Sequence, residues 1–393
     1  MNVLLKGATL LDGNGGSAVP ASAVLLAADK ISAVAGPYDA EGLDRDCATI
    51  DLAGKYLLPG FVNVHDHVTN KRIRGTRAEK ARAPDEMLVA MGIQNALLNL
   101  REGITTIRDM GARKGISRMI KAALDSRMIF GPRLIVVLRG LTVTAGYSHL
   151  GGIEVDSPLE ARKAAGQLIK DGCDWVKCMA SIEWERAQGE PISAVNMDVA
   201  LMQAAFDIAH HHGKPCSVHA VCDQSIANAL EAGADSIEHG IMLTEKTAET
   251  MARRGAFLVP TLSGYLEHCN DWGRGEGVMR HGHLLQEYHG KAFQNAVRAD
   301  VKFAFGTDTL GNFVDEARAM QAAGVSAMDC VVAASRTGAE LLGLGAEIGT
   351  IEPGKLADLV VLNANPLETP AAFGDIYRVI KSGRIFDPDQ IPI

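Results

Sequence analysis

Tyr56-Leu-Leu-Pro-Gly-Phe-Val-Asn-Val64 is an apolar, strand-like run that ends directly in His65-Asp66-His67. Side chains at positions i and i+2 of a strand point to the same side, so the imidazoles of His65 and His67 can hold one metal ion at the end of this strand. Two histidines at a strand terminus can equally be satisfied polar residues without a ligand. The motif alone therefore leaves a metal site and a purely structural pair open.

Seven further apolar segments share the strand-like character of this run. Four of them, at 174–177, 215–219, 235–239 and 301–308, end in Lys177, His219, His239 and Asp308, and the other three lie at 105–109, 133–138 and 256–261. Helix-like stretches such as 157–169, with Ser157 at the N-cap, separate them. Eight strands alternating with helices predict an α/β protein, a parallel (β/α)₈ barrel of the TIM type. Its active site is expected at the carboxyl ends of the strands.

The two chain ends carry shorter strand-like runs of their own. Residues 1–55 contain three of them, and residues 349–393 contain two, at 357–362 and 377–386. The N-terminal strands alone would leave an unpaired sheet edge. We therefore expect a small composite β-sandwich domain made of residues 1–55 and 349–393, beside a barrel domain made of residues 56–348.

Composition favours small-molecule chemistry. The 393 residues are 47% hydrophobic and carry a net charge of −8, which argues against disorder and against nucleic acid or an anionic membrane as the main partner. No apolar run is long enough for a membrane span, and the N-terminus does not resemble a signal peptide. Seven cysteines without CxxC spacing indicate reduced thiols and a cytoplasmic protein. These features leave a homo-oligomer open.

The strand-end side chains are typical metal ligands. Imidazoles with one carboxylate suit Zn²⁺, or Mn²⁺, Co²⁺ or Fe²⁺; the five residues are His65, His67, His219, His239 and Asp308. Five ligands exceed the need of one catalytic zinc, so we expect two divalent ions, which in turn need a bridging anion.

Lys177 is the candidate for that bridge. A plain ammonium would be repelled by two cations, whereas reaction with CO₂ turns the lysine into a carboxylated, anionic ligand. Apolar Trp175 and Val176 beside it would favour the neutral amine that this reaction requires. A strand-end lysine considered in isolation would more often bind substrate or lie exposed.

The combined motifs resemble the amidohydrolase superfamily. They are Pro59-Gly-Phe-Val-Asn-Val-His65-Asp-His67, Lys177, His219, His239, Gly306-Thr-Asp308 and Ile351-Glu-Pro-Gly-Lys-Leu-Ala-Asp358-Leu-Val-Val. The resemblance covers essentially the whole chain and is to the binuclear branch with Xaa-Pro and Xaa-Arg or Xaa-Lys dipeptidases and ochratoxin-hydrolysing amidases. It implies that His65, His67 and Asp308 hold the more buried metal, that His219 and His239 hold the second, and that carboxylated Lys177 bridges them.

The resemblance also implies a reaction. A water shared by two cations has its pKa lowered toward about 7 and becomes a bridging hydroxide nucleophile, with Asp308 as the proton shuttle. We expect cleavage of the amide bond of N-acyl or N-aminoacyl amino acids, as in a dipeptidase or carboxypeptidase. The alternative is a cyclic amide, imide or imidazolone hydrolase with the same metals. A metal-free binding protein is the non-enzymatic alternative, which would not need all six ligands.

Substrate contacts are harder to read from the sequence. His149, in Thr144-Ala-Gly-Tyr-Ser-His149, resembles the histidine of the Gly-Gly-His loop in this branch and is expected to hold the substrate carbonyl or carboxylate as a catalytic and binding residue. Many relatives carry a tyrosine two residues after the strand-five histidine; Val221 stands there, which predicts a more apolar pocket. Tyr265 is expected to line the pocket, with simple packing as the alternative.

Other polar residues are expected to lie on the surface. They are the helix-end triplet His210-His-His212, the pair His281-Gly-His283 with His268 and His289, and the arginines at 72, 74 and 77. The three arginines follow the first barrel strand closely enough to reach an anionic substrate as well.

Overall fold

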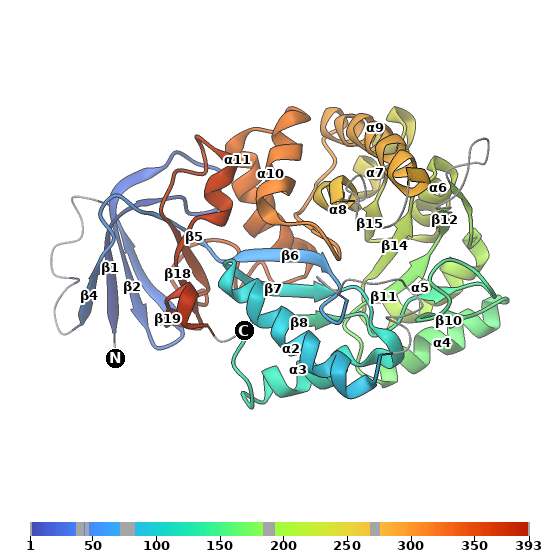
Figure 1. Cartoon of the computed structure of the whole chain (residues 1–393), viewed down its shortest axis with the longest axis horizontal. Helices are drawn as coiled ribbons and strands as arrows, with labels where there is room; N and C mark the ends of the chain where they lie inside the picture. Colours follow the sequence, from blue (N-terminus) through green and yellow to red (C-terminus); the bar gives the residue numbers. More distant parts are fainter. Residues whose placement is uncertain are drawn as a thin grey trace.

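A ring of parallel strands forms the centre of the computed structural model, which describes residues 2–36, 43, 47–70, 83–183, 193–267 and 276–391. The ring contains β6 (Phe61–Asp66), β7 (Ile104–Asp109), β8 (Arg133–Val136), β11 (Val176–Met179), β14 (Cys216–Ala220), β15 (Ser236–His239) and β16 (Phe257–Val259) (Figure 1). Every strand pair among them is parallel. The predicted (β/α)₈ barrel is confirmed.

Two irregular places complete the ring. The eighth segment, 301–308, is extended but hydrogen-bonds like a strand: the Leu258 amide donates to the Lys302 carbonyl, and the Val64 amide donates to the Phe305 carbonyl, both at 2.9 Å. On the other side, the Asp174 amide donates to the Val136 carbonyl at 2.7 Å and so connects β8 with the segment entering β11. The barrel is thus closed by backbone hydrogen bonds even where no regular strand exists.

Helices cover the outside of this ring. They are α2 (Asp85–Arg101), α3 (Ser117–Asp125), α4 (Pro158–Lys170), α5 (Val199–His211), α6 (Asp223–Ala232), α7 (Glu245–Arg254), α8 (Leu262–Glu267), α9 (Glu276–Arg298), α10 (Phe313–Ala322), α11 (Ala327–Val332) and α12 (Gly338–Leu341). Ser157 accepts a hydrogen bond from the Glu160 amide at the start of α4, which confirms the expected cap. A short hairpin of β12 (Ser181–Glu183) and β13 (Ser193–Val195), with β9 (Leu141–Thr142) and β10 (Ile153–Glu154), extends the loops at the carboxyl ends of the strands.

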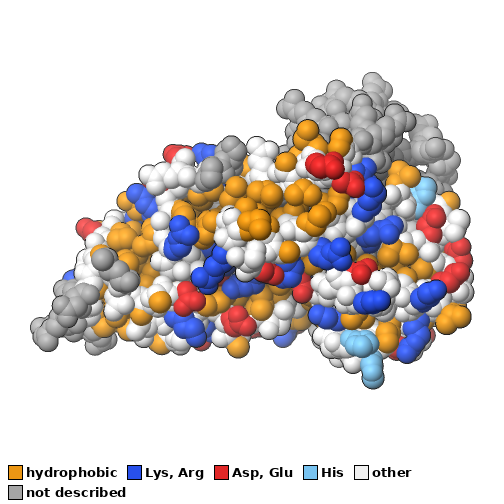
Figure 2. Space-filling model, turned by 90° about the horizontal axis from the view of Figure 1, so that it is seen from below, with side chains coloured by type: hydrophobic (Ala, Val, Ile, Leu, Met, Phe, Trp, Pro, Cys, Tyr) orange, Lys and Arg blue, Asp and Glu red, His pale blue; other side chains and the backbone are white. Residues whose placement is uncertain are grey.

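The surface carries both signs of charge. Figure 2 shows acidic and basic side chains interspersed with hydrophobic ones over one face, without a continuous field of either sign. None of the helices in the described part of the chain combines the length and the hydropathy that a membrane crossing requires.

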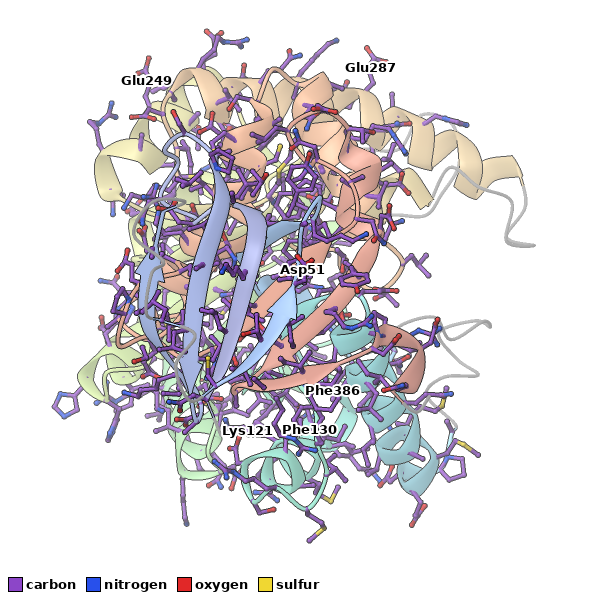
Figure 3. The ribbon with its side chains drawn as sticks, turned by 90° about the vertical axis from the view of Figure 1, so that its left-hand side faces the viewer. Asp51, Lys121, Phe130, Glu249, Glu287 and Phe386 are labelled. Carbon is purple, nitrogen blue, oxygen red and sulfur yellow. The ribbon has the colours of Figure 1, made fainter. Side chains whose placement is uncertain are left out.

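A separate eight-stranded sheet joins the two ends of the chain, and Figure 3 faces it. Its strands are β1 (Val3–Leu10), β2 (Val19–Ala27), β3 (Lys30–Ala35), β4 (Ala48–Asp51), β5 (Tyr56–Pro59), β17 (Leu359–Leu362), β18 (Ile376–Lys381) and β19 (Arg384–Phe386). N- and C-terminal strands meet where β5 pairs with β17. The sheet also bends back on itself, because the Ile31 amide donates to the Lys355 carbonyl at 2.9 Å. Phe386 packs on Phe130 of the barrel region with ring centroids 4.4 Å apart (Figure 3).

One expectation about the strands is wrong: the apolar run at 56–64 is not a single strand. It divides at Gly60 into β5, which belongs to the sheet of the chain ends, and β6, which belongs to the barrel. A Cβ atom at Gly60 would lie 2.4 Å from Oγ1 of Thr105, so only glycine allows this passage. The division into domains 1–55 with 349–393 and 56–348 stays a prediction.

Candidate metal centre

His65 and His67 end β6, and Asp308 comes beside them from the last segment of the ring. The amides of Thr307 and Asp308 both donate to the His65 carbonyl, at 3.0 and 2.8 Å, which fixes the Asp308 backbone in a left-handed conformation with φ +52°. Potential ligand atoms of His65, His67 and Asp308 all lie within 4.8 Å of one another. Nε2 of His67 is 3.7 Å from Oδ1 of Asp308.

His219 and His239 bring two more imidazoles to this centre. They lie near the carboxyl ends of the paired strands β14 and β15. The ring of His239 is 4.8 Å from that of His219 and 5.0 Å from that of His65, measured between centroids. The four histidines and Asp308, spread over 244 positions of the sequence, therefore surround one space at the carboxyl end of the barrel.

The hydrogen bonds of three of these histidines set their tautomers. Nδ1 of His67 donates to the Gly111 carbonyl at 2.8 Å, and Nδ1 of His65 lies 2.7 Å from the Glu238 carboxylate. Nδ1 of His239 lies 2.7 Å from Oγ1 of Thr261, whose own hydrogen goes to the Pro260 carbonyl. Each Nδ1 therefore carries the proton, and each Nε2 keeps a lone pair that can bind a metal ion.

His65 gives the clearest sign that a cation belongs here. Its Nε2 is buried and has no hydrogen-bond partner among the described residues. A buried acceptor without a donor is costly unless something else occupies its lone pair. Burial, with the nearby Lys177 charge, lowers the pKa of His65 to about 4, so the ring is the neutral form that binds metals.

A buried charge network holds His65 in place. Burial alone would raise the pKa of Glu238, but Arg108 and His65 outweigh it and lower that pKa to about 2. Nη2 of Arg108 donates to Glu238 at 2.8 Å, Nε donates to the Val64 carbonyl at 2.6 Å, and the guanidinium lies 4.4 Å from the centre of the Trp175 ring. Sequence analysis missed Arg108 and Glu238, although two charged side chains at inward-facing strand positions were a signal.

Lys177 lies on β11 and is only 2% exposed. No hydrogen bond or ion pair joins its Nζ to any residue within the described ranges. Burial lowers the pKa of Lys177, while the charges of Glu238 and Asp308 act in the opposite direction. The amine of Lys177 therefore lies close enough to Glu238 and Asp308 for their charges to act on it.

The substrate residues expected from the sequence divide into two sets. Val221 is fully buried and packs in a small apolar cluster with Tyr265, Ile241 and Leu285. The Tyr265 ring stands edge-on to His239, with centroids 5.3 Å apart, so both residues lie behind the metal centre. His149 lies instead in an exposed loop, where Nδ1 is 3.6 Å from Oε1 of Glu154. Its substrate role stays a prediction.

Tyr147 is a neighbour of the centre that sequence analysis did not single out. Its ring stacks on His219 with centroids 4.3 Å apart and an interplanar angle of 12°. The loop that carries it is held by Thr144 and Ala145, whose amides donate to Asp156 and Glu154. A Cβ at Gly146 would lie 2.5 Å from the Asn196 side chain, so the turn before Tyr147 requires glycine. Its signal was its place two residues before His149.

The loop after β16 is braced against the loop that carries Asp308. Glu316 of α10 is buried, and its carboxylate accepts from the amides of Leu262 and Ser263, at 3.0 and 2.7 Å, at the start of α8. A Cβ at Gly264 would lie 3.1 Å from the Thr307 carbonyl oxygen, so the two loops are in close contact. The positions of Tyr265 and Asp308 thus both depend on the packing between these two loops.

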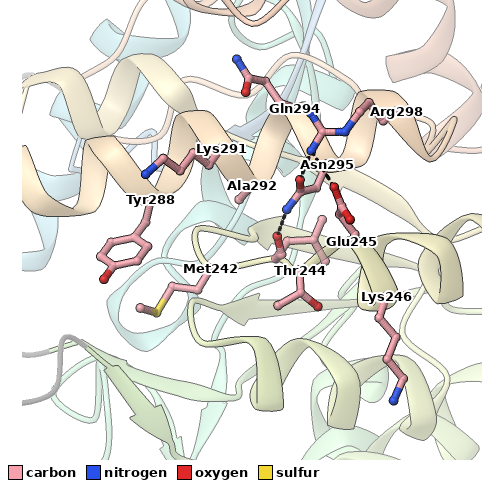
Figure 4. A pocket seen from close by; sticks show the side chains of 11 residues that line it. Met242, Thr244, Glu245, Lys246, Tyr288, Lys291, Ala292, Gln294, Asn295 and Arg298 are labelled. Carbon is pink, nitrogen blue, oxygen red and sulfur yellow. Dashed lines mark hydrogen bonds and ion pairs between the residues drawn. The ribbon is translucent and has the colours of Figure 1, made fainter.

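The remaining expectations fall elsewhere. The arginines at 72, 74 and 77 and His268 lie outside the described residues, as does the side chain of His281. His289 is buried, not on the surface as expected, and its Nε2 donates to the His239 carbonyl at 3.0 Å. A surface cavity of about 780 Å³ between α7 and α9, lined by Thr244, Glu245, Tyr288 and Arg298, contains none of the expected ligands (Figure 4).

Fold and site together define a class: hydrolases with a (β/α)₈ barrel and a metal centre at the carboxyl end of its strands. Residues 56–386 match the Amidohydrolase family, and the chain belongs to that family. It is an amide-hydrolysing enzyme, as the sequence motifs predict.

Known proteins support this placement. The chain is 27% identical over 380 residues to the ochratoxinase of Aspergillus niger, covering 84% of this chain and 75% of that one. It is 26% identical over 396 residues to the imidazolonepropionase of a Bradyrhizobium species, covering 91% of each. The crystal structure of a Xaa-Pro dipeptidase with bound methionine in the active site superposes with a TM-score of 0.88 at 25% identity, over 98% of this chain and 100% of that one.

Proposed function

We propose that this enzyme cleaves the amide bond of N-acyl or N-aminoacyl amino acids with two divalent metal ions, Zn²⁺ in preference, and a carboxylated Lys177. The observation that carries the proposal is the buried amine of Lys177, whose charge acts on His65, His239 and Asp308. A buried ammonium without an ion-pair partner is strongly disfavoured. Carboxylation would give this side chain the negative charge that a pair of cations requires.

The donor set fits two ions. Nε2 of His65 and Nε2 of His67 with Asp308 would hold one ion, and the imidazoles of His219 and His239 the second, with Lys177 between them. The ions would supply Lewis acidity toward the scissile carbonyl and lower the pKa of a water near it.

The chain's own groups would do the rest. The surrounding imidazoles and Lys177 outweigh burial and hold the pKa of Asp308 well below its usual range, so the group is an ionised carboxylate that can bind a cation. Its position beside His65 and His67, and not its basicity, is what would let it take the proton of the attacking water. That proton would then be passed to the leaving amine. Tyr147, stacked on His219, would form a wall against which the acyl group lies, and the buried cluster of Val221 and Tyr265 would support His239 from behind.

Relatives support a substrate with an amino-acid product. The similar dipeptidase structure holds a free amino acid, methionine, in its active site. The expectation of an apolar substrate group rests on Val221 and its apolar neighbours Ile241 and Leu285, which offer no polar side-chain group beside Tyr265.

A second candidate function is favoured by one comparison. The imidazolonepropionase is 26% identical to this chain and the ochratoxinase 27%. The match covers 91% of the imidazolonepropionase but 75% of the ochratoxinase. Opening of a cyclic amide or imidazolone would use the same ligands. Both candidate functions imply small-molecule substrates. Both are also compatible with a cytoplasmic location, which the six free cysteines of the described residues favour.

Two measurements test the proposal. Elemental analysis of active protein, expressed with zinc or manganese and bicarbonate, should find two metal equivalents per chain; one equivalent or less contradicts the binuclear centre. Values of kcat/KM should then be compared across N-acyl amino acids, dipeptides, hydantoins, lactams and imidazolones. Turnover of the cyclic compounds alone would replace the first function with the second.

A further inference from the structure

The opposite end of the barrel carries a second group of metal-capable side chains. His210 lies in the last turn of α5, Cys216 begins β14, and Asp235 precedes β15, so all three lie where helices return to the strands. Their potential ligand atoms lie within 4.8 Å of one another. We infer that these residues form a separate binding site for one thiophilic divalent ion such as Zn²⁺ or Co²⁺.

Asp235 joins the three residues. Its Oδ2 lies 2.9 Å from Nε2 of His210 and accepts the backbone amide of Cys216 at 2.7 Å. The Asp235 amide in turn donates to the Cys216 carbonyl at 2.9 Å. The carboxylate is therefore fixed between the other two donors by the pairing of β14 with β15.

Exposure differs within the group in a way that suits a site open on one side. The side chains of His210 and Asp235 are each 42% exposed, whereas Cys216 is completely buried. Among the described residues, the sole hydrogen-bond contact of the Cys216 sulfur is a long one of 3.9 Å with the Lys214 carbonyl. An ion would enter from solvent between the imidazole and the carboxylate and meet the sulfur on the inner side.

The donor types select the ion. Imidazole, thiolate and carboxylate together are typical of zinc, whereas Mg²⁺ and Ca²⁺ prefer oxygen ligands alone. Three protein ligands leave a fourth position for water. Asp235 also borders a cavity of about 310 Å³ with Gly233, Arg254 and Phe257, which His210 and Cys216 do not line.

Binding would move two protons. The ion would replace the proton between His210 and Asp235, which shifts to Nδ1 of His210 or leaves to solvent, and the thiol proton of Cys216 would also leave to solvent. Burial, with Asp235 nearby, holds the pKa of Cys216 well above its usual value, so the sulfur keeps its proton until a cation arrives. Without an ion, the His210 and Asp235 contact is a half-exposed hydrogen bond at 2.9 Å.

An ion at this site would connect the starts of two strands whose ends carry ligands of the catalytic centre. β14 begins with Cys216 and contains His219 near its end, and β15 ends with His239. An ion at the base would hold the starts of these two strands together. We expect binding to raise the melting temperature and not to replace the catalytic metals.

Cobalt distinguishes the two sites, because the catalytic ligand set contains no sulfur. The enzyme, kept reduced, is dialysed until its zinc content does not exceed two per chain, so that zinc does not occupy His210, Cys216 and Asp235. It is then titrated with Co²⁺, and the thiolate-to-cobalt charge-transfer absorption is recorded. We expect this absorption to saturate at one Co²⁺ per chain and to disappear in Cys216→Ser. His210→Gln, an exposed substitution that should fold normally, should weaken Co²⁺ binding at least tenfold.

A matched control is available for each of the two substitutions. Cys173→Ser changes another buried thiol, and His211→Gln changes the adjacent histidine of α5; both should bind Co²⁺ like the parent. Absence of the charge-transfer absorption in the parent enzyme overturns the inference, and so does equal weakening by His210→Gln and His211→Gln. Neither result bears on the catalytic centre, whose metal content is measured separately.

Discussion

Nδ1 of His65 lies 2.7 Å from Oε2 of Glu238, and the other oxygen of that carboxylate accepts from Arg108 at 2.8 Å. The orientation of a predicted metal ligand on β6 thus depends on charged residues from β15 and β7, across the barrel interior. All three side chains are fully buried.

Glu238→Gln should weaken both the fold and the metal centre. The substitution leaves Arg108 buried without a counter-charge and turns one of the two acceptor oxygens into an NH₂ donor, so the side chain can no longer accept from both His65 and Arg108. We expect a loss of about 3–5 kcal/mol in the free energy of unfolding and a 10–100-fold loss in metal affinity. Urea unfolding and chelator competition measure the two effects. The control is Glu249→Gln on exposed α7 (Figure 3), which should change stability by less than about 0.5 kcal/mol; equal effects of the two variants would contradict the role of Glu238.

Lys177→Ala should remove the second metal and leave the barrel folded. Loss of the bridging carboxylate would leave His219 and His239 unable to hold an ion alone, and a short carboxylic acid should restore part of the activity. Metal content and activity with and without acetate are the measurements. Lys381→Ala is the matched control, since this buried lysine pairs with Asp358 at 2.7 Å and should alter stability without altering metal content. Unchanged activity in Lys177→Ala would show that the lysine is not a ligand.

Tyr147 should contribute to substrate binding through its ring. Tyr147→Ala removes the wall stacked on His219, and we expect kcat/KM for N-acyl amino acids to fall at least tenfold, mainly through KM. Tyr147→Phe keeps the stack, so its difference from the parent enzyme measures the hydroxyl alone. Tyr288→Phe, in the cavity of Figure 4, should be neutral. A Tyr147→Ala enzyme with the parent's kcat/KM would exclude this contact.

Glu316 should make stability depend on pH. Burial raises the pKa of Glu316 from its usual 4.5 to about 7. Below pH 4.5 the folded and unfolded states both hold the proton, and stability is full; as the pH rises toward 7 the unfolded state loses the proton first, so stability falls. Relative to Glu316→Gln, the parent enzyme should lose about 3 kcal/mol between pH 4.5 and 7.5. Denaturant unfolding of both proteins at several pH values tests this, and parallel profiles would refute it.

Much of the architecture follows from local sequence. The alternation of apolar strand segments with capped helices predicts the barrel because strand and helix periods are local properties, as at Ser157. Placing histidines, Lys177 and Asp308 at strand ends predicts that they converge, because parallel strands of a barrel present their carboxyl ends at one face.

Contacts between distant residues were decided only by the tertiary structure. Gly60 divides an unbroken apolar run because of how closely Thr105 approaches it, and no local pattern contains that distance. His65 and Glu238 are 173 positions apart, and their pairing depends on which inward-facing positions the barrel places together. Tyr147 reaches His219 only because a tight turn at Gly146 directs it there. Sequence thus determined which side chains stand at strand ends, and folding determined their partners, because partner choice depends on packing between segments that are remote in the chain.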